Sequence, residues 1–232
     1  METLEQRTHD MKSLSQQLKC PTGEEGRELA HSMFESNKGM IIDSVASLRI
    51  KGKNRILELG PGNGAHLPLI FGQASGLKYF GLDVSRDMEE EARMNNKSFI
   101  ADNRALFSHY DGQKIPYVHN LFDRILTVNT IYFWERPVVF LNELHRVLKP
   151  EGICVITFVE GNFMKKLPFV DGSFKLFDIS KFAKLVSETP FRDVDVQTRS
   201  ERVRSKSGEI VNREFLVATL QKAPKVSGQG KG

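Results

Sequence analysis

The chain is poor in cysteine and has no long hydrophobic run, and each shortage excludes a class of protein. Its two cysteines, Cys20 and Cys154, have neither the spacing of metal ligands nor the number that a disulfide framework needs. We therefore expect reduced thiols and predict no metal site. No apolar run approaches the roughly 20 residues of a membrane-spanning helix, and the polar start at residues 1–7 lacks a secretory core. These features predict a soluble, cytoplasmic protein without a membrane span.

The charge balance is also mild, with a formal net charge of +4. Much of the excess can come from a basic cluster in the C-terminal region: Arg199, Arg202, Arg204, Lys206 and Arg213. Basic charge alone does not indicate a nucleic-acid enzyme. With 40% apolar residues in 232, the chain can bury a full core in one domain.

A glycine-rich turn is the most informative feature present. The apolar run Ile56–Leu59 leads directly into Gly60, Gly62 and Gly64. Because glycine has no Cβ and tolerates positive φ, such a turn can bring backbone N–H groups close to a ligand. Glu58 stands just before the turn, and its acceptor-only carboxylate suits a bound ammonium or sulfonium group and would repel a pyrophosphate.

The glycines alone leave two cofactor classes open, because Gly60, Gly62 and Ala65 also satisfy the dinucleotide fingerprint. A second run, Leu77–Leu82, ends in Asp83, where a carboxylate can accept both hydroxyls of a ribose in either class. A third element, Leu106–Tyr110, delivers Asp111-Gly112, and a fourth, Phe122–Asn129, follows it. The order of these elements is stronger evidence than any one of them.

Taken together, the ordered set resembles the class I S-adenosylmethionine-dependent methyltransferases over roughly residues 50 to 220. The segment Leu141–Gly152 is similar to the family's helix, Pro/Gly turn and fifth strand. Within the family, the closest resemblance is to small-molecule methyltransferases of the ubiquinone and menaquinone biosynthesis type. Many of those relatives carry paired histidines after strand four, where this chain has Tyr132-Phe133.

The resemblance implies S-adenosyl-L-methionine as cofactor and S-adenosyl-L-homocysteine as product. The residues that it places at the cofactor are Glu58, Gly60, Gly62, Asn63, Gly64, Asp83, Val84, Met88, Asp111, Gly112 and Asn129. Structural alternatives remain for several of them. Asp83 can cap the helix that begins near Ser85, and Asp111 can serve as a turn residue. Met88 can be core packing, and Asn129 can satisfy its own backbone at a strand end.

The chain divides into three zones that predict an α/β fold. Residues 1–49 are expected to form an N-terminal helical cap. Its helix at Glu24–Leu48 carries an apolar stripe that includes Met33 and Ile41, and Thr22 with Glu25 makes a capping box. Residues 50–221 alternate strands and helices, such as those at Asp87–Ala101 and Pro137–Leu148, which predicts a doubly wound, Rossmann-like, mostly parallel seven-stranded sheet.

The C-terminal part of that domain should form an antiparallel hairpin. After a helix near Ser180–Ser187, two strand candidates, Phe191–Arg204 and Glu209–Leu220, flank the turn Ser205–Gly208. Residues 222–232 are rich in Gly, Lys and Ser and are expected to be a disordered tail. Because the cap precedes the first strand, we expect it to lie over the sheet's carboxyl edge as a lid.

The function predicted is S-adenosylmethionine-dependent methyl transfer to a small, partly apolar or aromatic molecule, with Tyr132, Phe133 and Trp134 at the acceptor. The alternative for these aromatics is that they only pack the next helix. No catalytic base is predicted, since no histidine has a partner carboxylate at a telling spacing. The Asp/Asn-Pro-Pro-aromatic signature of base-amine methylation is absent after strand four. An NAD-linked oxidoreductase and a non-catalytic S-adenosylmethionine-binding module stay as alternatives, and the oligomeric state is open.

Overall fold

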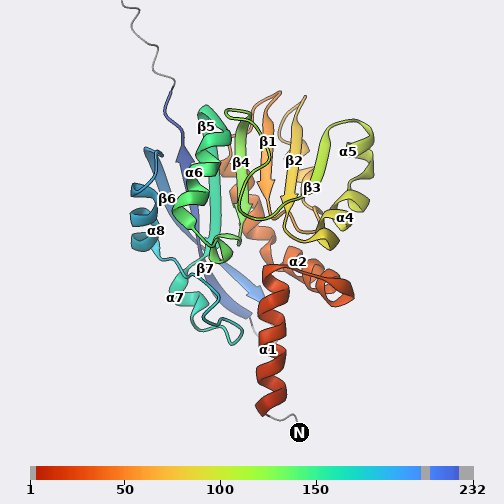
Figure 1. Ribbon diagram of the computed structural model, residues 1–232, viewed down its shortest axis with the longest axis vertical. Coiled ribbons are helices and arrows are strands. Elements are labelled where there is room, and N and C mark those ends of the chain that lie inside the picture. The colour runs from red at the N-terminus through yellow and green to blue at the C-terminus, as the bar shows by residue number, and fades with distance from the viewer. Residues whose placement is uncertain (1–3, 205–209, 225–232) are drawn as a thin grey trace, which may run out of the picture.

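The computed structural model describes residues 4–204 and 210–224, and its centre is one seven-stranded sheet of order β3-β2-β1-β4-β5-β7-β6 (Figure 1). The strands are β1 (Arg55–Leu59), β2 (Lys78–Asp83), β3 (Ala105–His109), β4 (Phe122–Val128), β5 (Leu148–Val159), β6 (Asp193–Arg204) and β7 (Ile210–Gln221). The first five strands are parallel to one another, whereas β7 pairs antiparallel with both β5 and β6. The predicted fold class, a doubly wound sheet ending in an antiparallel hairpin, is confirmed.

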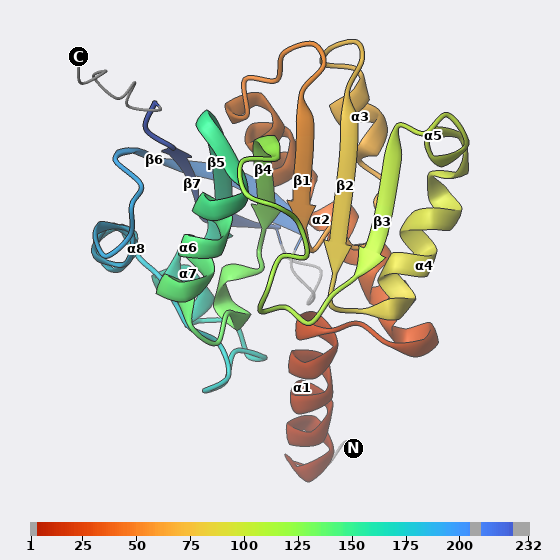
Figure 2. The same cartoon turned by 45° about the horizontal axis from the view of Figure 1, so that its top comes forward.

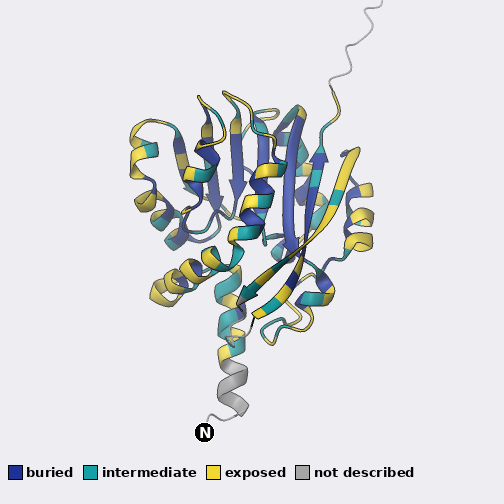
Figure 3. Ribbon diagram, turned by 180° about the vertical axis from the view of Figure 1, so that it is seen from behind, coloured by how far each residue is buried: buried dark blue, intermediate teal, exposed yellow. Residues whose placement is uncertain are grey.

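Helices cover both faces of this sheet. The longer ones are α1 (Leu4–Lys19), α2 (Gly23–Ser47), α4 (Arg86–Asn95), α6 (Pro137–Val147) and α8 (Ile179–Ser187), and the shorter ones are α3 (Leu67–Phe71), α5 (Lys97–Ala101), α7 (Gly161–Met164) and the 3-10 turn η1 (Ile131–Phe133). Figure 1 shows α6 and α8 in front of the sheet, and the reverse view in Figure 3 shows α2 crossing the other face. In Figure 2, α4 and α5 lie beyond β3, and α1 projects away from the body.

The core lies where β1, β4 and β5 meet, because strands covered on both faces must be apolar on both sides. Leu57, Ile125 and Val155 are fully buried and lie on these three strands. By contrast, β6 forms the exposed edge of the sheet in Figure 3. It carries charged side chains such as Asp193, Asp195 and Arg199, and charge on an edge strand opposes pairing with other chains.

Several predicted boundaries differ from the structure at the N-terminal side. Thr22 is the N-cap of α2, but its side chain makes no capping hydrogen bond, so the predicted capping box is wrong. Instead, the backbone N–H of Gly23 donates to Asp87 Oδ2 at 2.6 Å, and Thr22 N–H donates to Gln17 Oε1 at 2.8 Å. The predicted helix Asp87–Ala101 is two helices, since Asn96 leaves the helical conformation between them.

The C-terminal boundaries differ as well. Strand β5 begins at Leu148, directly after α6, so the expected Pro/Gly turn lies inside the strand as an irregularity in which Glu151 has φ +61°. The hairpin turn predicted at 205–208 and residues 225–232 of the tail lie outside the described residues. Lys222, which the sequence assigned to a disordered tail, is instead anchored. Its Nζ donates to Asn120 Oδ1 and to the carbonyls of His145 and Leu148.

Candidate active site

A cavity of about 320 Å³ lies at the carboxyl ends of the parallel strands, where α/β sheets bind their ligands. The loops after β1, β2, β3 and β4 contribute Glu58, Gly60, Gly62, Asn63, His66, Asp83, Val84, Met88, Tyr110, Asp111, Gly112, Asn129, Thr130, Phe133 and Trp134 to its lining. The N-terminal helices contribute Leu18, Cys20, Ala30, Met33, Phe34, Asn37 and Ile41. The structure thus brings together most of the residues that the sequence placed at the cofactor.

The glycine turn forms one wall of this cavity. Gly60 has φ +69°, and a Cβ there would lie 2.6 Å from Thr130 Cγ2. Gly62 has φ +57°, yet a Cβ there would meet nothing within 4 Å, so this glycine faces open space on the cavity side. Gly64 does not line the cavity. It packs instead against Asn96 and Ala92 of the α4–α5 region, which differs from the predicted contact with a cofactor.

Asp83 is buried at the end of β2 and is held by the glycine turn. Its Oδ2 accepts from the N–H of Gly62 at 3.2 Å, and its Oδ1 accepts from the N–H of Ser85 at 2.9 Å. Burial raises the pKa of Asp83 to about 6, although the backbone hydrogen bonds oppose the rise. The predicted cap role is taken by Ser85, whose side chain accepts from the N–H of Met88.

Glu58 sits in a hydrogen-bond network that the sequence did not reveal. Its Oε2 accepts from Tyr79 Oη at 2.7 Å and bonds His66 Nε2 at 2.8 Å. Both partners are buried, with Tyr79 1% and His66 6% exposed. Burial lowers the pKa of His66, but the charge and hydrogen bond of Glu58 outweigh it and leave that pKa raised. The eight-residue separation of Glu58 and His66 matches no recognisable motif, and nothing in the sequence pointed to Tyr79.

Residues expected at the adenine end also line the cavity. Asp111 accepts from the N–H groups of Lys114 and Gln113 through Oδ1, which lowers the pKa of its carboxyl group. This is the turn role that the sequence left as an alternative, and it occupies only one of the two oxygens. Met88 is buried and still reaches the cavity, while Val84 and Gly112 lie beside it.

The segment after β4 places its aromatic residues differently. Phe133 and Trp134 line the cavity, and each also packs on another ring: Phe133 on Phe174 and Trp134 on Phe140. Tyr132 does not line the cavity, so the predicted acceptor contact is not where its side chain lies. Its hydroxyl instead donates to Asn129 Oδ1 at 2.9 Å and accepts from the N–H of Val159 at 2.6 Å.

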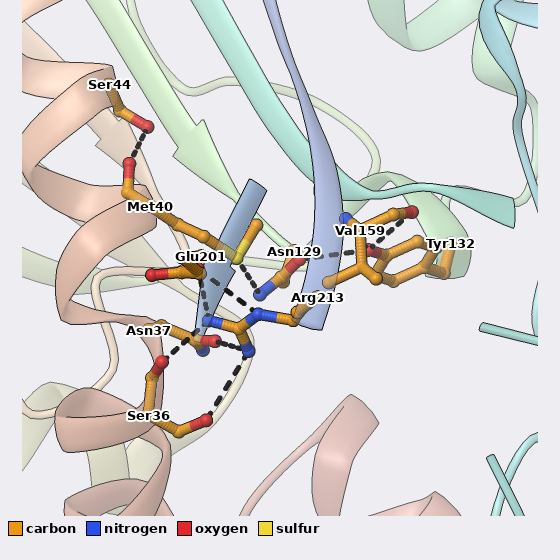
Figure 4. A network of polar contacts seen from close by, with 9 residues as sticks. All are labelled: Ser36, Asn37, Met40, Ser44, Asn129, Tyr132, Val159, Glu201 and Arg213. Carbon is orange, nitrogen blue, oxygen red and sulfur yellow. Dashed lines mark hydrogen bonds and ion pairs between the residues drawn. The ribbon is translucent and has the colours of Figure 1, made fainter. Parts of the chain in front are cut away.

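Asn129 is therefore held from two sides, as Figure 4 shows. Besides the hydrogen bond from Tyr132, its Nδ2 lies 3.6 Å from Met40 Sδ on α2. Its φ of +58° is one that asparagine tolerates better than most residues. The side chain is fixed by its neighbours where it lines the cavity.

A buried ion pair fastens α2 to the C-terminal hairpin close to this point (Figure 4). Arg213 of β7 is 7% exposed, and its Nη2 lies 2.7 Å from Glu201 Oε1 of β6. The same guanidinium donates to the carbonyl of Ser36 at 2.6 Å and to Asn37 Oδ1 at 3.0 Å. Farther along α2, Ser44 Oγ donates to Thr157 Oγ1 of β5 at 2.6 Å. The carboxyl half of α2 is thus anchored to the sheet.

The other end of α2 and its link to α1 cover the part of the cavity near Asp83. Ser85 Oγ donates to the carbonyl of Pro21, and Cys20 Sγ lies 3.6 Å from the carbonyl oxygen of Val84. These contacts are all with the start of α4 and the loop before it.

Comparison with known proteins adds independent findings. A methyltransferase-domain family model matches residues 57–156. The chain is 32% identical over 114 residues to the fatty-acid O-methyltransferase of Mycolicibacterium smegmatis, covering 49% of this chain and 40% of that protein. It is 37% identical over 106 residues to the demethylmenaquinone methyltransferase of Clavibacter sepedonicus, covering 44% and 40%. The chain thus spans about two fifths of the length of these curated relatives.

Solved structures share the fold at low sequence identity. A phosphoethanolamine N-methyltransferase of Haemonchus contortus, solved with S-adenosylhomocysteine, is 16% identical with a TM-score of 0.62, covering 81% of this chain and 53% of that one. The [4+2]-cyclase SpnF is 17% identical with a TM-score of 0.61, covering 80% and 81%. No helix among residues 4–204 and 210–224 is both long and apolar enough to span a membrane. The matched domain, the relatives and the sheet order together support the predicted resemblance to the class I S-adenosylmethionine-dependent methyltransferases.

Proposed function

We propose that this protein binds S-adenosylmethionine in the cavity and transfers its methyl group to a small apolar molecule. The observation that carries the proposal is the pair of buried carboxylates, Glu58 and Asp83, on either side of the glycine turn in one cavity. Asp83 can accept from ribose hydroxyls, and Glu58 can accept from an ammonium group. Asp111, Gly112 and Met88 would hold the adenine end.

Glu58 argues against an NAD-linked oxidoreductase. A dinucleotide would place its pyrophosphate at the glycine turn, where Glu58 would add a buried negative charge beside it. No observation in the described residues favours that alternative. The fold alone does not establish methyl transfer, because the [4+2]-cyclase SpnF has the same fold and is named for a different reaction. Turnover therefore has to be measured directly.

The acceptor side of the cavity supports an apolar substrate. Met33, Phe34, Phe133 and Trp134 line it, and they come from α2 and from the segment after β4. Two curated relatives carry names that specify a fatty acid and a demethylmenaquinone, both of which are largely apolar. We favour an acceptor of that character, with a long alkyl or aromatic portion against these side chains.

The transfer itself would be an in-line displacement in which S-adenosylmethionine supplies an activated methyl group on a sulfonium. The side chains of the cavity would align the acceptor and exclude water, which can contribute roughly 7 to 11 kcal/mol. Among the described lining residues, His66 is the one histidine, and Glu58 already engages it. We therefore favour an acceptor that ionises by itself, such as a carboxylic acid or an acidic phenol.

Residues 18–34 would act as the movable part of a lid, and residues 36–45 as its fixed base. The base is held by Arg213 and Thr157. The movable part is held by hydrogen bonds to Asp87, Ser85 and Val84 and by the ion pair of Arg27 with Asp87. A segment held by few contacts can open at small cost. This division refines the expected cap of residues 1–49.

A methyl-transfer assay tests the proposal. Purified protein is incubated with S-adenosylmethionine and, separately, with dodecanoic acid, a short-chain menaquinol precursor or dodecylamine, and S-adenosylhomocysteine is quantified by mass spectrometry. We expect acceptor-dependent S-adenosylhomocysteine with an acid or a quinol. Binding of NADH that is tighter than binding of S-adenosylhomocysteine would refute the cofactor assignment. Tight S-adenosylhomocysteine binding without turnover on a broad acceptor panel would support the non-catalytic alternative.

A further inference from the structure

The two oxygens of the Glu58 carboxylate have different surroundings. Tyr79 Oη and His66 Nε2 both bond Oε2, at 2.7 and 2.8 Å. In the part of the chain that the structure describes, no hydrogen bond reaches Oε1. Yet the side chain of Glu58 is only 3% exposed, and the residue lines the cavity. An oxygen without a partner, on a largely buried carboxylate that lines a cavity, is an acceptor available to a ligand.

The two partners can act only as donors toward this carboxylate. Burial and the neighbouring charge of Glu58 raise the pKa of Tyr79 well above its ordinary value, so the phenol keeps its proton. His66 can reach Oε2 through an Nε2–H group either as the imidazolium or as the Nε2–H tautomer. Both side chains are themselves locked in place. Tyr79 packs on Phe107 with ring centroids 5.5 Å apart, and His66 directly precedes α3.

Two donors on one oxygen have two effects on the carboxylate. They replace hydrogen bonds to water that the carboxylate loses through burial. They also fix the rotation of the carboxylate, because both hydrogen bonds must end on Oε2 while Oε1 stays on the cavity side. Without them, the carboxylate of Glu58 could turn away from the cavity.

We infer that Tyr79 and His66 are positioning residues, which hold the Glu58 carboxylate in place and turn Oε1 toward the ammonium group of the cofactor's amino acid portion. The inference rests on the proposed function, since it assumes that the cavity takes S-adenosylmethionine. It assigns a role to two side chains that lie under the site and act on the cofactor through Glu58. The inference also predicts that substitutions of Tyr79 and His66 will not change the binding of the adenosine half of the ligand.

Two ligands that differ only in the amino acid portion provide the test. S-adenosylhomocysteine carries the ammonium group, whereas 5′-methylthioadenosine keeps the adenosine and the thioether and lacks it. Affinities are measured by isothermal titration calorimetry for the full chain and for Tyr79→Phe, His66→Leu, His66→Gln and Glu58→Gln. Tyr79→Phe preserves the ring that packs on Phe107, and His66→Gln keeps a hydrogen-bond donor. Both variants should fold, so they test the inference even if His66→Leu does not fold.

We expect Tyr79→Phe and His66→Leu each to weaken S-adenosylhomocysteine binding by about tenfold, the effect of one lost hydrogen bond to a charged group. Glu58→Gln should weaken it at least as much, and His66→Gln should retain most of the affinity. Binding of 5′-methylthioadenosine should change by less than about twofold in all four. Equal losses for both ligands, or unchanged S-adenosylhomocysteine binding in Tyr79→Phe, would overturn the inference. If the unmutated chain binds neither ligand, the proposed function itself fails.

Discussion

Replacing Asp83 with asparagine should stabilise the unliganded protein while it destroys the ligand site. The pKa of this buried carboxyl group is raised from 3.8 to about 6, so its ionised form costs the native state about 3 kcal/mol at pH 8. The contribution of the neutral form to stability is complete below pH 3.8 and is lost as the pH rises through 6. An asparagine side chain at this position cannot accept from both Gly62 and Ser85 equally well, which costs about 1 kcal/mol.

The pH dependence of the free energy of unfolding separates the effect of the Asp83 charge from this cost in hydrogen bonding, which does not vary with pH. Relative to the unmutated protein, the free energy of unfolding of Asp83→Asn should increase by about 2 kcal/mol between pH 4.5 and pH 8. Urea denaturation at both pH values measures this difference, with the exposed Asp102→Asn as a control that should show almost none. A difference between Asp83→Asn and the unmutated protein that stays constant from pH 4.5 to 8 would refute the argument.

The same variant should fail to bind the cofactor product. Loss of a charged acceptor for ribose hydroxyls should weaken S-adenosylhomocysteine binding by about 1.5 to 3 kcal/mol at pH 8, which calorimetry can resolve. A protein that gains stability and loses affinity through one substitution would show that Asp83 is kept for binding at the expense of the fold. Unchanged affinity in Asp83→Asn would contradict its assignment to the ribose.

Three further perturbations address the turn, the ion pair and the lid. Gly62→Ala puts a methyl group on the cavity side at φ +57°, so it should cost about 1 kcal/mol of stability. Calorimetry should show a larger loss than this in the free energy of S-adenosylhomocysteine binding. A purely structural glycine would show only the loss of stability. Arg213→Met leaves Glu201 and the Ser36 carbonyl without their partner and should lower the free energy of unfolding in urea by about 2 kcal/mol or more. The control substitution at an exposed neighbour, Arg202→Met, should change that free energy little. Equally small effects of the two substitutions would mean that the Arg213–Glu201 pair contributes nothing to stability. On binding S-adenosylhomocysteine, hydrogen exchange should slow in residues 18–34 and stay constant in residues 36–45, and equal protection throughout with and without ligand would remove the lid.

The sequence predicted the parts of the site that depend on local chain order. Strand ends, glycines and the acids after them follow from a few adjacent letters, which is why Glu58, Gly62 and Asp83 converge in the structure as expected. Side-chain direction within a turn does not follow in this way. Tyr132 and Phe133 are adjacent, yet the 3-10 turn sends Tyr132 toward Val159 and Phe133 to the cavity.

Contacts between distant segments were the other limit. Arg213 looked like one member of a basic cluster, and its partners on α2 lie 176 and 177 residues away. The capping box failed for a related reason, because Asp87, 64 residues away, satisfies the backbone of Gly23 in place of a local side chain. Local sequence predicts which side chains could cap a helix, but hydrogen bonds from distant segments can take their place in the folded protein.

The link between Arg213 and α2 also orders events during synthesis. Residues 36 and 37 are made well before the guanidinium that fixes them, which lies 176 and 177 residues later in the chain. Until β7 pairs with β5, the carboxyl half of α2 lacks its anchor on the hairpin side. Closing so long a loop is slow compared with forming a helix. The nascent cap should therefore hold its apolar stripe against an incomplete sheet until β7 has been made, and a chain that stops before β7 should expose that stripe to chaperones.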